Sequence, residues 1–241
     1  MKNVVVIIDY GMGNVGSVKN ALAFLGYEAL LSSSPADLER ATHLILPGVG
    51  AFADGMKNLT KSGLLPALES EVLTRQKPIL GLCLGMQLFA SEGEEDGLHN
   101  GLGWIKGRVR RFSVDERRYK VPHVGWNDVY PVRTPLTPVG GDHSNKLMGV
   151  DAPISRSRST RSNGVYPKDR ATIFLGVKRP IFYFVHSYHL IPEDKSIISA
   201  EAEYGERFVA AIEKDNIFGL QFHPEKSQQE GLRVLENFLK P

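Results

Sequence analysis

Hydrophobic residues in the N-terminal half fall into short continuous runs separated by helically spaced positions. The run Val4–Ile8 is unbroken and rich in β-branched side chains, which is typical of a strand buried on both faces. The same pattern predicts further strands at Tyr27–Leu31, Leu44–Leu46 and Pro78–Leu82. Helices are predicted around Val18–Leu25, at Pro35–Arg40, in a long region ending at Arg75, and at Leu84–Ala90. This alternation predicts an α/β fold with a mainly parallel central sheet and helices on both faces.

The C-terminal half shows a different pattern, in which short strand signals follow one another with closely spaced turns. The predicted strands cover Arg108–Phe112, Trp126–Tyr130, Phe182–Tyr188, Ile197–Tyr204, Phe208–Glu213 and Ile217–Gln221, and a last helix covers Gln229–Leu239. Such turns favour antiparallel pairing, so we expect an antiparallel strand region added on one side of the parallel core. All these elements are expected to form one domain over residues 1–241.

Residues 135–169 interrupt this periodicity. They include the tract SRSRSTRSNG, which has few apolar anchors. A stretch this long without periodicity is typical of an insertion or a mobile loop. We therefore predict an unusual, mobile insertion at about 135–169 within the single domain.

The 241 residues include 29 basic and 27 acidic side chains, but the net charge of +2 is unevenly distributed. Residues 106–120 carry a local charge of +5 and residues 131–180 a local charge of +6, which leaves −9 for the rest. A basic middle could face phosphate or an acidic partner, although a solvated hairpin and loop would show the same charge. No DNA-reading helix or aromatic-interleaved RNA motif accompanies it, so nucleic acid is not an expected partner.

The apolar runs and the cysteine content limit the compartment. No run approaches the ~20 residues needed to span a bilayer, and the start MKNVVVIIDYGMGN reaches a glycine loop too soon for a signal peptide. A single cysteine excludes an internal disulfide and suits a reducing compartment. We expect a cytoplasmic protein that does not associate with membranes.

The segment PILGLCLGMQLF places this one cysteine, Cys83, where a predicted strand gives way at once to a helix. This is the cysteine form of the G-x-S-x-G nucleophile elbow. Gly81 and Gly85 suit the strained turn, because a Cβ at either position would clash with its neighbours. The amide of Leu84 could then face an oxyanion. A buried structural cysteine between helix-packing glycines would show the same spacing.

A thiol nucleophile needs a base and an orienting carboxylate. His223 follows the strand Ile217–Gln221 in GLQFHPEKS, with Glu225 two residues on and Pro224 stiffening the turn. The loop PGVG, residues 47–50, follows another strand and leaves backbone N–H groups free to face a substrate oxygen, unless it is a plain turn.

Two other patterns allow different chemistry. Gly11–Gly16 matches G-x-G-x-x-G after a strand, but the second strand ends in Leu31 and three serines, and Asp37 lies inside the next helix. A dinucleotide site lacks its ribose-binding acid there, so an NAD-binding protein is the weaker alternative. The run HSYH invites a metal site, but His186 and His189 would lie on opposite faces of a strand. We expect neither a metal nor another cofactor.

Taken together, the segments resemble the class I, triad-type glutamine amidotransferases. The elbow and HPE segments are shared by that whole family, whereas others are more specific to the glutaminase subunits of imidazole glycerol phosphate synthases. The motifs in question are DYGMGN (9–14), LPGVGAF (46–52), GLCLGMQL (81–88), VPHVGWN (121–127), YFVHSY (183–188) and GLQFHPEKS (219–227). The resemblance implies a flavodoxin-like α/β fold.

The resemblance also implies the role of each matching residue. Cys83 would attack the side-chain amide of glutamine to form a thioester, with His223 as general base and then acid and Glu225 orienting it. The remaining positions correspond to an oxyanion hole (Gly48, Val49, Gly50, Leu84), a glutamine pocket (Gln87, His186, Ser187, Tyr188) and a partner interface (Asn14, Pro122, His123, Trp126). In the family, the loop holding Gly48–Gly50 is thought to reorient when the partner's substrate binds.

The family's glutaminase docks on a separate (β/α)8-barrel cyclase, which receives the ammonia and makes imidazole glycerol phosphate in histidine biosynthesis. The long segment between the GWN and FVHSY strands departs from the usual short connection, so a second acceptor stays open. Close relatives pair with a barrel partner to amidate bacterial surface sugars. A catalytically silent homologue and a cysteine peptidase are further alternatives, which the presence of all three triad residues and the HPE spacing disfavour.

Overall fold

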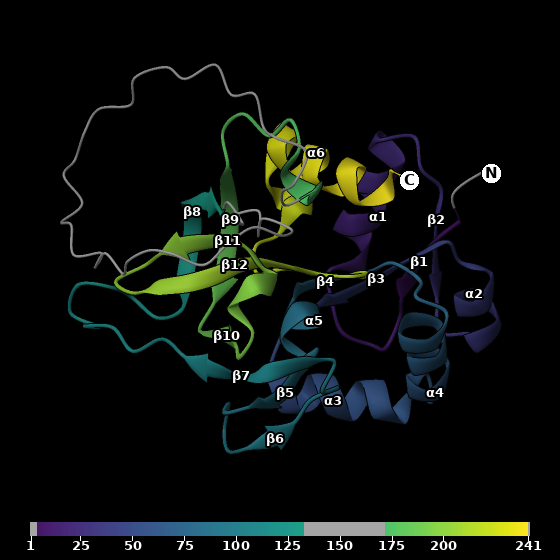
Figure 1. Ribbon diagram of the computed structural model, residues 1–241, viewed down its shortest axis with the longest axis horizontal. Helices are drawn as coiled ribbons and strands as arrows, with labels where there is room; N and C mark the ends of the chain where they lie inside the picture. The colour runs from purple at the N-terminus through teal and green to yellow at the C-terminus, as the bar shows by residue number, and fades with distance from the viewer. Residues whose placement is uncertain (1–3, 133–171, 241) are drawn as a thin grey trace, which may run out of the picture.

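The computed structural model describes residues 4–132 and 172–240, and it confirms the predicted alternation of strands and helices (Figure 1). The N-terminal half contains β1 (Val5–Ile8), α1 (Val15–Phe24), β2 (Ala29–Ser32), α2 (Pro35–Arg40), β3 (His43–Gly48), α3 (Phe52–Lys61), α4 (Leu65–Glu69), the π-helical turn η1 (Ser70–Thr74), β4 (Ile79–Cys83) and α5 (Leu84–Gln87). No helix within the described ranges is long and apolar enough to cross a membrane.

The rest of the described chain consists mainly of short strands. These are β5 (Ala90–Gly93), β6 (His99–Asn100), β7 (Ile105–Arg111), β8 (His123–Pro131), β9 (Ile181–His186), β10 (Tyr188–Pro192), β11 (Ile198–Glu203), β12 (Arg207–Lys214) and β13 (Ile217–Leu220). The short helical turns η2 (Thr172–Phe174), η3 (Lys195–Ile197) and η4 (Pro224–Lys226) lie between them, and α6 (Gln228–Leu239) ends the fold.

A nine-stranded sheet runs through the molecule in the order β2-β1-β3-β4-β13-β12-β11-β8-β9. The five strands from β2 to β13 pair in parallel, and the four strands from β12 to β9 pair antiparallel. The prediction of a parallel core with an antiparallel region on one side is therefore confirmed. Because parallel strands end at the same edge, the loops that follow β1, β3, β4 and β13 meet there.

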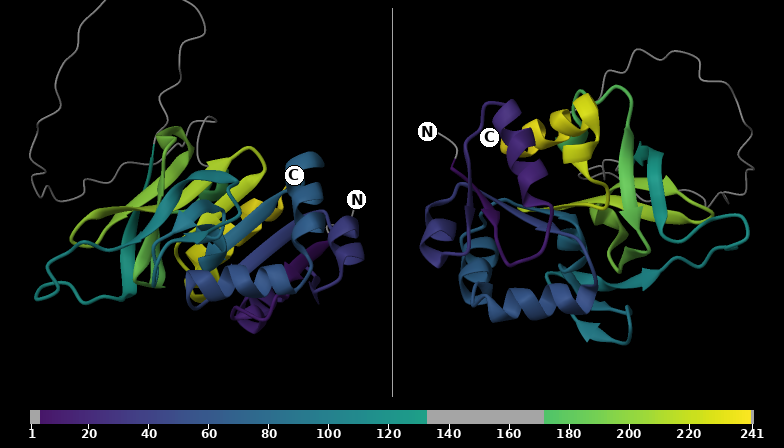
Figure 2. Two further views of the ribbon diagram at one scale, coloured as in Figure 1. Left: turned by 90° about the horizontal axis from the view of Figure 1, so that it is seen from below. Right: turned by 180° about the vertical axis from the view of Figure 1, so that it is seen from behind.

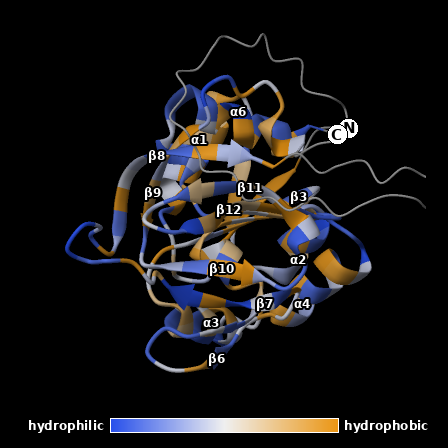
Figure 3. Ribbon diagram, turned by 60° about the vertical axis from the view of Figure 1, so that its left-hand side comes forward, coloured by the Kyte–Doolittle hydropathy of each residue, from blue (hydrophilic) through white to orange (hydrophobic). Residues whose placement is uncertain are grey.

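Helices cover both faces of the parallel strands, as predicted. The purple helix α1 and the yellow helix α6 lie together on one face, as Figure 2 shows from behind, while α3, α4 and α5 lie on the other face (Figure 1). In Figure 3 the central strand β3 is hydrophobic, whereas the helices carry both hydrophobic and hydrophilic residues. The four residues of β1 and the six of β3 are all buried, which explains their unbroken apolar runs.

Several predicted elements differ in their bounds, and two of these differences arise from a second sheet. The helix expected at Leu84–Ala90 ends at Gln87, because Ala90 already pairs with Ile105 in a second, four-stranded sheet of order β10-β7-β5-β6. The strand expected at Phe182–Tyr188 is two strands that part at Ser187, because β9 pairs with β8 in the large sheet and β10 pairs with β7 in the small one. Ser187 is thus the point where the chain changes sheets.

Two half-buried carboxylates fix the chain at Thr172 and at Lys178–Arg179. Glu213 accepts hydrogen bonds from the backbone and hydroxyl of Thr172, both at 2.9 Å, and Glu230 accepts from the amides of Lys178 and Arg179 at 3.1 Å. Burial raises the pKa of Glu213, although these hydrogen bonds oppose the shift. The insertion predicted at about 135–169 lies outside the described residues.

Candidate active site

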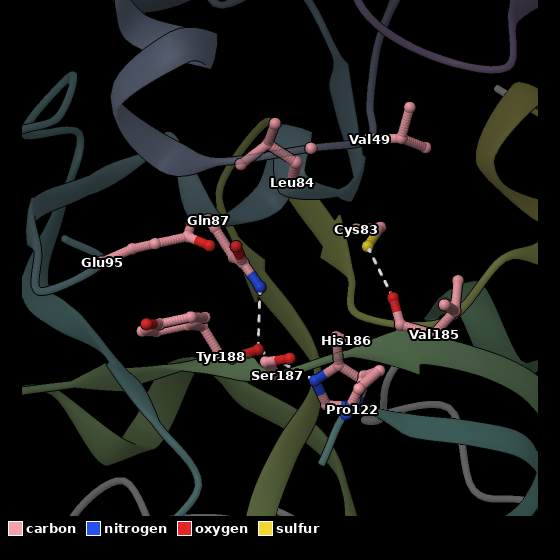
Figure 4. Close-up of a pocket in the computed structure, with 11 residues that line it drawn as sticks. Val49, Cys83, Leu84, Gln87, Glu95, Pro122, Val185, His186, Ser187 and Tyr188 are labelled. Atoms are coloured by element: carbon pink, nitrogen blue, oxygen red, sulfur yellow. Dashed lines mark hydrogen bonds between the residues drawn. The ribbon is translucent and has the colours of Figure 1, made fainter.

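Cys83 sits in a strained turn between β4 and α5, as the nucleophile-elbow pattern predicts. Its backbone φ is 52°, an unfavourable value for a residue with a Cβ. The flanking glycines make room for this turn, since a Cβ on Gly81 would come within 2.6 Å of the Met86 amide and one on Gly85 would overlap the Leu46 carbonyl. The side chain of Cys83 is buried, and its sulfur borders a pocket (Figure 4).

His223 and Glu225 lie together beyond the end of β13, the strand next to β4. His223 Nδ1 lies 2.9 Å from Glu225 Oε1, and both side chains are at most 3% exposed. This bond directs the other ring nitrogen, Nε2, away from the carboxylate, and Nε2 is buried without a hydrogen-bond partner among the described residues. The arrangement is that of a base held by an orienting carboxylate.

The surroundings of His223 favour its protonated form. Burial lowers the pKa of His223, but the neighbouring Cys83 and Glu225, the latter hydrogen-bonded to Nδ1, outweigh burial and raise the pKa to about 10. Cys83 is thus one of the two groups that raise the pKa of this ring. A protonated His223 can in turn stabilise negative charge on the neighbouring sulfur.

The loop after β3 lies directly beside the nucleophile. Gly48 pairs with Cys83 in the register of β3 and β4, and Val49 and Gly50 border the same pocket as the sulfur. Leu84, the first residue of α5, lines the pocket as well. The four residues predicted for an oxyanion hole thus lie around Cys83. Because α5 has only four residues, its dipole can contribute little to thiolate stability.

The pocket in front of Cys83 has a volume of about 230 Å³, below the roughly 300–1,000 Å³ typical of drug-sized ligands. All four residues predicted to bind glutamine, Gln87, His186, Ser187 and Tyr188, line it, together with Val185 and Pro122. In Figure 4, Val49 and Leu84 lie on one side of the pocket, and the segment Val185–Tyr188 lies on the other. The pocket therefore suits a small polar metabolite.

The sequence patterns missed two polar residues of this site. Glu95 lines the pocket, where one carboxylate oxygen accepts a 2.7 Å hydrogen bond from the Phe52 amide. Gln221, which is fully buried, donates from Nε2 to the Cys83 sulfur at 3.6 Å. The available signal for Gln221 was a polar residue at the end of an apolar strand, whereas Glu95 lies among acidic residues of a loop and gave none.

The histidines of the HSYH run differ from the prediction. His186 and His189 were expected on opposite faces of one strand, but each ring centroid lies 5.0 Å from that of Phe112, because the strand breaks at Ser187. His123 joins them, with its Nδ1 3.2 Å from His186 Nε2. Burial lowers the pKa of all three. No group of residues able to hold a metal ion occurs in residues 4–132 and 172–240.

Three of the four predicted interface residues are exposed, and one is not. Asn14, Pro122 and Trp126 are exposed, with Trp126 49% accessible. His123 is only 3% exposed and stacks on Tyr204 with ring centroids 4.0 Å apart. The interface role of His123 stays a prediction, and strand alternation turns its side chain inward from β8.

The glycine loop after β1 is used for packing within the chain. A Cβ on Gly13 would come within 3.2 Å of Pro47, and one on Gly50 within 2.9 Å of the Met12 methyl group, so the loop covers the segment that borders Cys83. Asp37 accepts a 2.6 Å hydrogen bond from the Ser32 hydroxyl. Neither feature supports a dinucleotide site.

A thiol nucleophile, a histidine held by a carboxylate and a neighbouring glycine loop define a cysteine-dependent hydrolase site. The profile of class-I glutamine amidotransferases matches residues 6–241. The HisH 2 subunit of imidazole glycerol phosphate synthase from Methanococcus maripaludis is 41% identical over 237 residues, covering 98% of each chain. The HisH subunit from Syntrophotalea carbinolica is 42% identical, covering 97% of this chain and 98% of its own. The chain therefore belongs to the class-I glutamine amidotransferases and, among them, to the HisH subunit family.

Solved structures share the fold at low sequence identity. A crystallised glutamine amidotransferase superposes with a TM-score of 0.66 at 18% identity, covering 98% of this chain and 97% of its own.

The sequence alignments to M. maripaludis HisH 2 and to Pseudomonas aeruginosa HisH 2 (41% identical) span 98% of each of the two aligned chains. These relatives are thus about as long as this chain, so its overall length is shared within the family.

Proposed function

We propose that this chain is a glutaminase subunit that hydrolyses glutamine to glutamate and ammonia through a thioester on Cys83. The observation that carries the proposal is the placement of Cys83, His223 and Glu225 at one edge of the sheet, with the base held by a buried carboxylate 2.9 Å away. Sequence relatives at about 40% identity that are named HisH support the same activity.

The first half of the reaction forms the acyl-enzyme. The Cys83 thiolate attacks the side-chain amide carbon of glutamine, and the carbonyl electrons move onto oxygen. Backbone N–H groups of Leu84 and of the Gly48–Gly50 loop would hold this oxyanion. His223 then gives its Nε2 proton to the leaving nitrogen, and ammonia departs.

The second half releases glutamate. Water attacks the thioester while His223 takes one of its protons, and collapse of the second tetrahedral intermediate regenerates the thiolate. Glu225 keeps the same ring nitrogen directed at the reaction in both halves. Glu95, at the pocket wall, would face the ammonium group of the substrate, and Gln87 would face its other polar groups.

The ammonia acceptor is the remaining part of the proposal. The relatives' names make them subunits of imidazole glycerol phosphate synthase, and we propose a (β/α)8-barrel cyclase as the partner and histidine biosynthesis as the pathway. Pro122 lines the pocket, and we expect it to contact this partner together with the exposed Asn14 and Trp126. A closed interface would keep ammonia from being protonated in water before it reacts.

A second acceptor has one observation in its favour. The relatives from M. maripaludis, Campylobacter jejuni and P. aeruginosa carry the numbered names HisH 1 or HisH 2. Numbering of this kind fits organisms with two such subunits, of which one could serve a surface-sugar partner instead.

Co-purification of the full chain from its native cells, followed by glutaminase assays, separates these possibilities. The expected result is a barrel cyclase in the complex and glutamine hydrolysis that rises when the cyclase's substrate, an intermediate of histidine biosynthesis, is added. A sugar-biosynthesis partner would show that the acceptor is wrong and the glutaminase activity right. Absence of glutamine hydrolysis in any complex would refute the glutaminase activity itself.

A further inference from the structure

Gln221 connects the nucleophile to the pocket through a chain of side-chain amides. Its Nε2 lies 3.6 Å from the Cys83 sulfur, and its Oε1 lies 3.0 Å from Gln87 Nε2. Gln87 Nε2 in turn lies 2.9 Å from the backbone carbonyl of Tyr188. Gln221 is 0% exposed and Gln87 is 5% exposed, so water does not compete for these bonds.

The orientation of the two side-chain amides is fixed at the Tyr188 end of this series of hydrogen bonds. A backbone carbonyl can only accept a hydrogen bond, so the Tyr188 carbonyl requires the NH₂ group of Gln87. The same NH₂ group faces Gln221, which must therefore present its oxygen to Gln87 and its NH₂ group to Cys83. The Gln87 oxygen is not used in the chain and is left for the pocket.

A second contact of the sulfur has the opposite character. Cys83 Sγ lies 3.8 Å from the Val185 carbonyl, which can accept a hydrogen bond from the thiol but repels a thiolate (Figure 4). Gln221 can donate a hydrogen bond to a thiolate, and this bond weakens when the sulfur is protonated. Two titratable groups lie close enough to be affected by charge on Cys83: His223, from the turn after β13, and Tyr10, from the loop after β1.

We propose that Gln221 stabilises the Cys83 thiolate by donating a hydrogen bond to the sulfur, with Gln87 and the Tyr188 carbonyl holding its amide in that orientation. The inference rests on the proposed thiol nucleophile but adds a residue to it. It also explains why a polar side chain directly follows the apolar strand β13 in the protein interior, where an unpaired amide would be costly.

Alkylation of the full chain by iodoacetamide tests the proposal without glutamine turnover. Cys83 is the only cysteine, so incorporated label reports on this sulfur alone. In Gln221→Met, which removes the donor at similar side-chain length, we expect alkylation at neutral pH to slow by about tenfold, because hydrogen bonds to charged groups are among the stronger ones. The pH of half-maximal alkylation should move upward.

Gln221→Glu is a second variant of nearly the same shape, and its carboxylate should slow alkylation in the same direction. Gln229→Met, at an exposed position of α6, is the matched control and should alkylate like the unchanged chain. Circular dichroism shows which variants fold. If either Gln221 variant folds and keeps the unchanged pH profile of alkylation, the proposal is wrong. An unaltered chain that alkylates but never hydrolyses glutamine would instead refute the glutaminase.

Discussion

Glu225 Oε1 lies 2.9 Å from His223 Nδ1 in a position where both side chains are almost completely buried. A carboxylate placed there fixes the ring so that Nε2, and not Nδ1, serves the sulfur. It also helps to hold the pKa of His223 at about 10 against the effect of burial.

Glu225→Gln should therefore reduce kcat for glutamine hydrolysis by about 10³-fold or more, because the neutral amide can hold the ring in the wrong tautomer. KM should change little, since Glu225 does not line the pocket. Steady-state kinetics with the partner complex measure both constants. Glu236→Gln, which removes a carboxylate only from surface ion pairs, is the control. Equal losses of kcat in the two variants would show that Glu225 does not orient His223.

Gly48→Ala should disrupt the loop that faces Cys83. A Cβ there would lie 2.8 Å from the Tyr10 hydroxyl, 2.8 Å from the Gly85 amide and 2.8 Å from the Leu84 Cβ. The loop must shift, and we expect glutaminase activity to fall by about 10²-fold, the cost of losing one oxyanion donor.

The double variant Tyr10→Phe with Gly48→Ala refines this prediction. Tyr10 is buried, its hydroxyl has no hydrogen-bond partner among the described residues, and burial together with Cys83 raises its pKa, so the hydroxyl stays neutral. Removing it relieves one of three clashes, so activity should recover only partly. Full activity in Gly48→Ala alone would contradict the placement of the loop.

The buried histidines predict a loss of stability in mild acid. Burial lowers the pKa of His123 and of His189 to about 4, from an ordinary value of 6.5. Below pH 6.5 the unfolded chain binds protons that the folded chain does not, so the free energy of unfolding falls as the pH drops from 6.5 towards 4. One such ring contributes on the order of 3 kcal/mol over that window.

Urea unfolding across this pH range measures the slope. His189→Phe, which removes one of the titrating rings, should flatten the profile whatever its effect on stability at neutral pH. His223 acts in the opposite sense, because its raised pKa adds stability that is complete below pH 6.5 and is lost as the pH rises through about 10. A profile without any slope between pH 6.5 and 4 would contradict the burial of the cluster.

Deletion of residues 140–164 should spare glutamine hydrolysis. The triad and the described residues that line the pocket all lie outside this segment, and Glu213 and Glu230 fix the chain from Thr172 onward. Hydrolysis within about twofold of the full chain is expected in the partner complex. A deletion variant that does not form the thioester would show that the segment belongs to the core of the domain.

The sequence predicts the site well where the chemistry lies in consecutive residues. The elbow around Cys83 and the His223–Glu225 pair each come from a strand end and the turn that follows it, so their spacing already contains the geometry. Gln221 and Glu95 reach the site only through strand order and a distant loop. The break at Ser187 was missed because each half of the run pairs in a different sheet, which is a property of the fold and not of the local pattern.

The central claim is that Cys83 carries the acyl group of glutamine. Intact-protein mass spectrometry of the chain in its partner complex, quenched in acid during turnover of glutamine, tests it most directly. We predict a glutamyl adduct that maps to the peptide containing Cys83, disappears as glutamine is exhausted, and is absent together with all hydrolysis in Cys83→Ala. Hydrolysis that persists in Cys83→Ala, or an adduct on any other residue, would contradict the account.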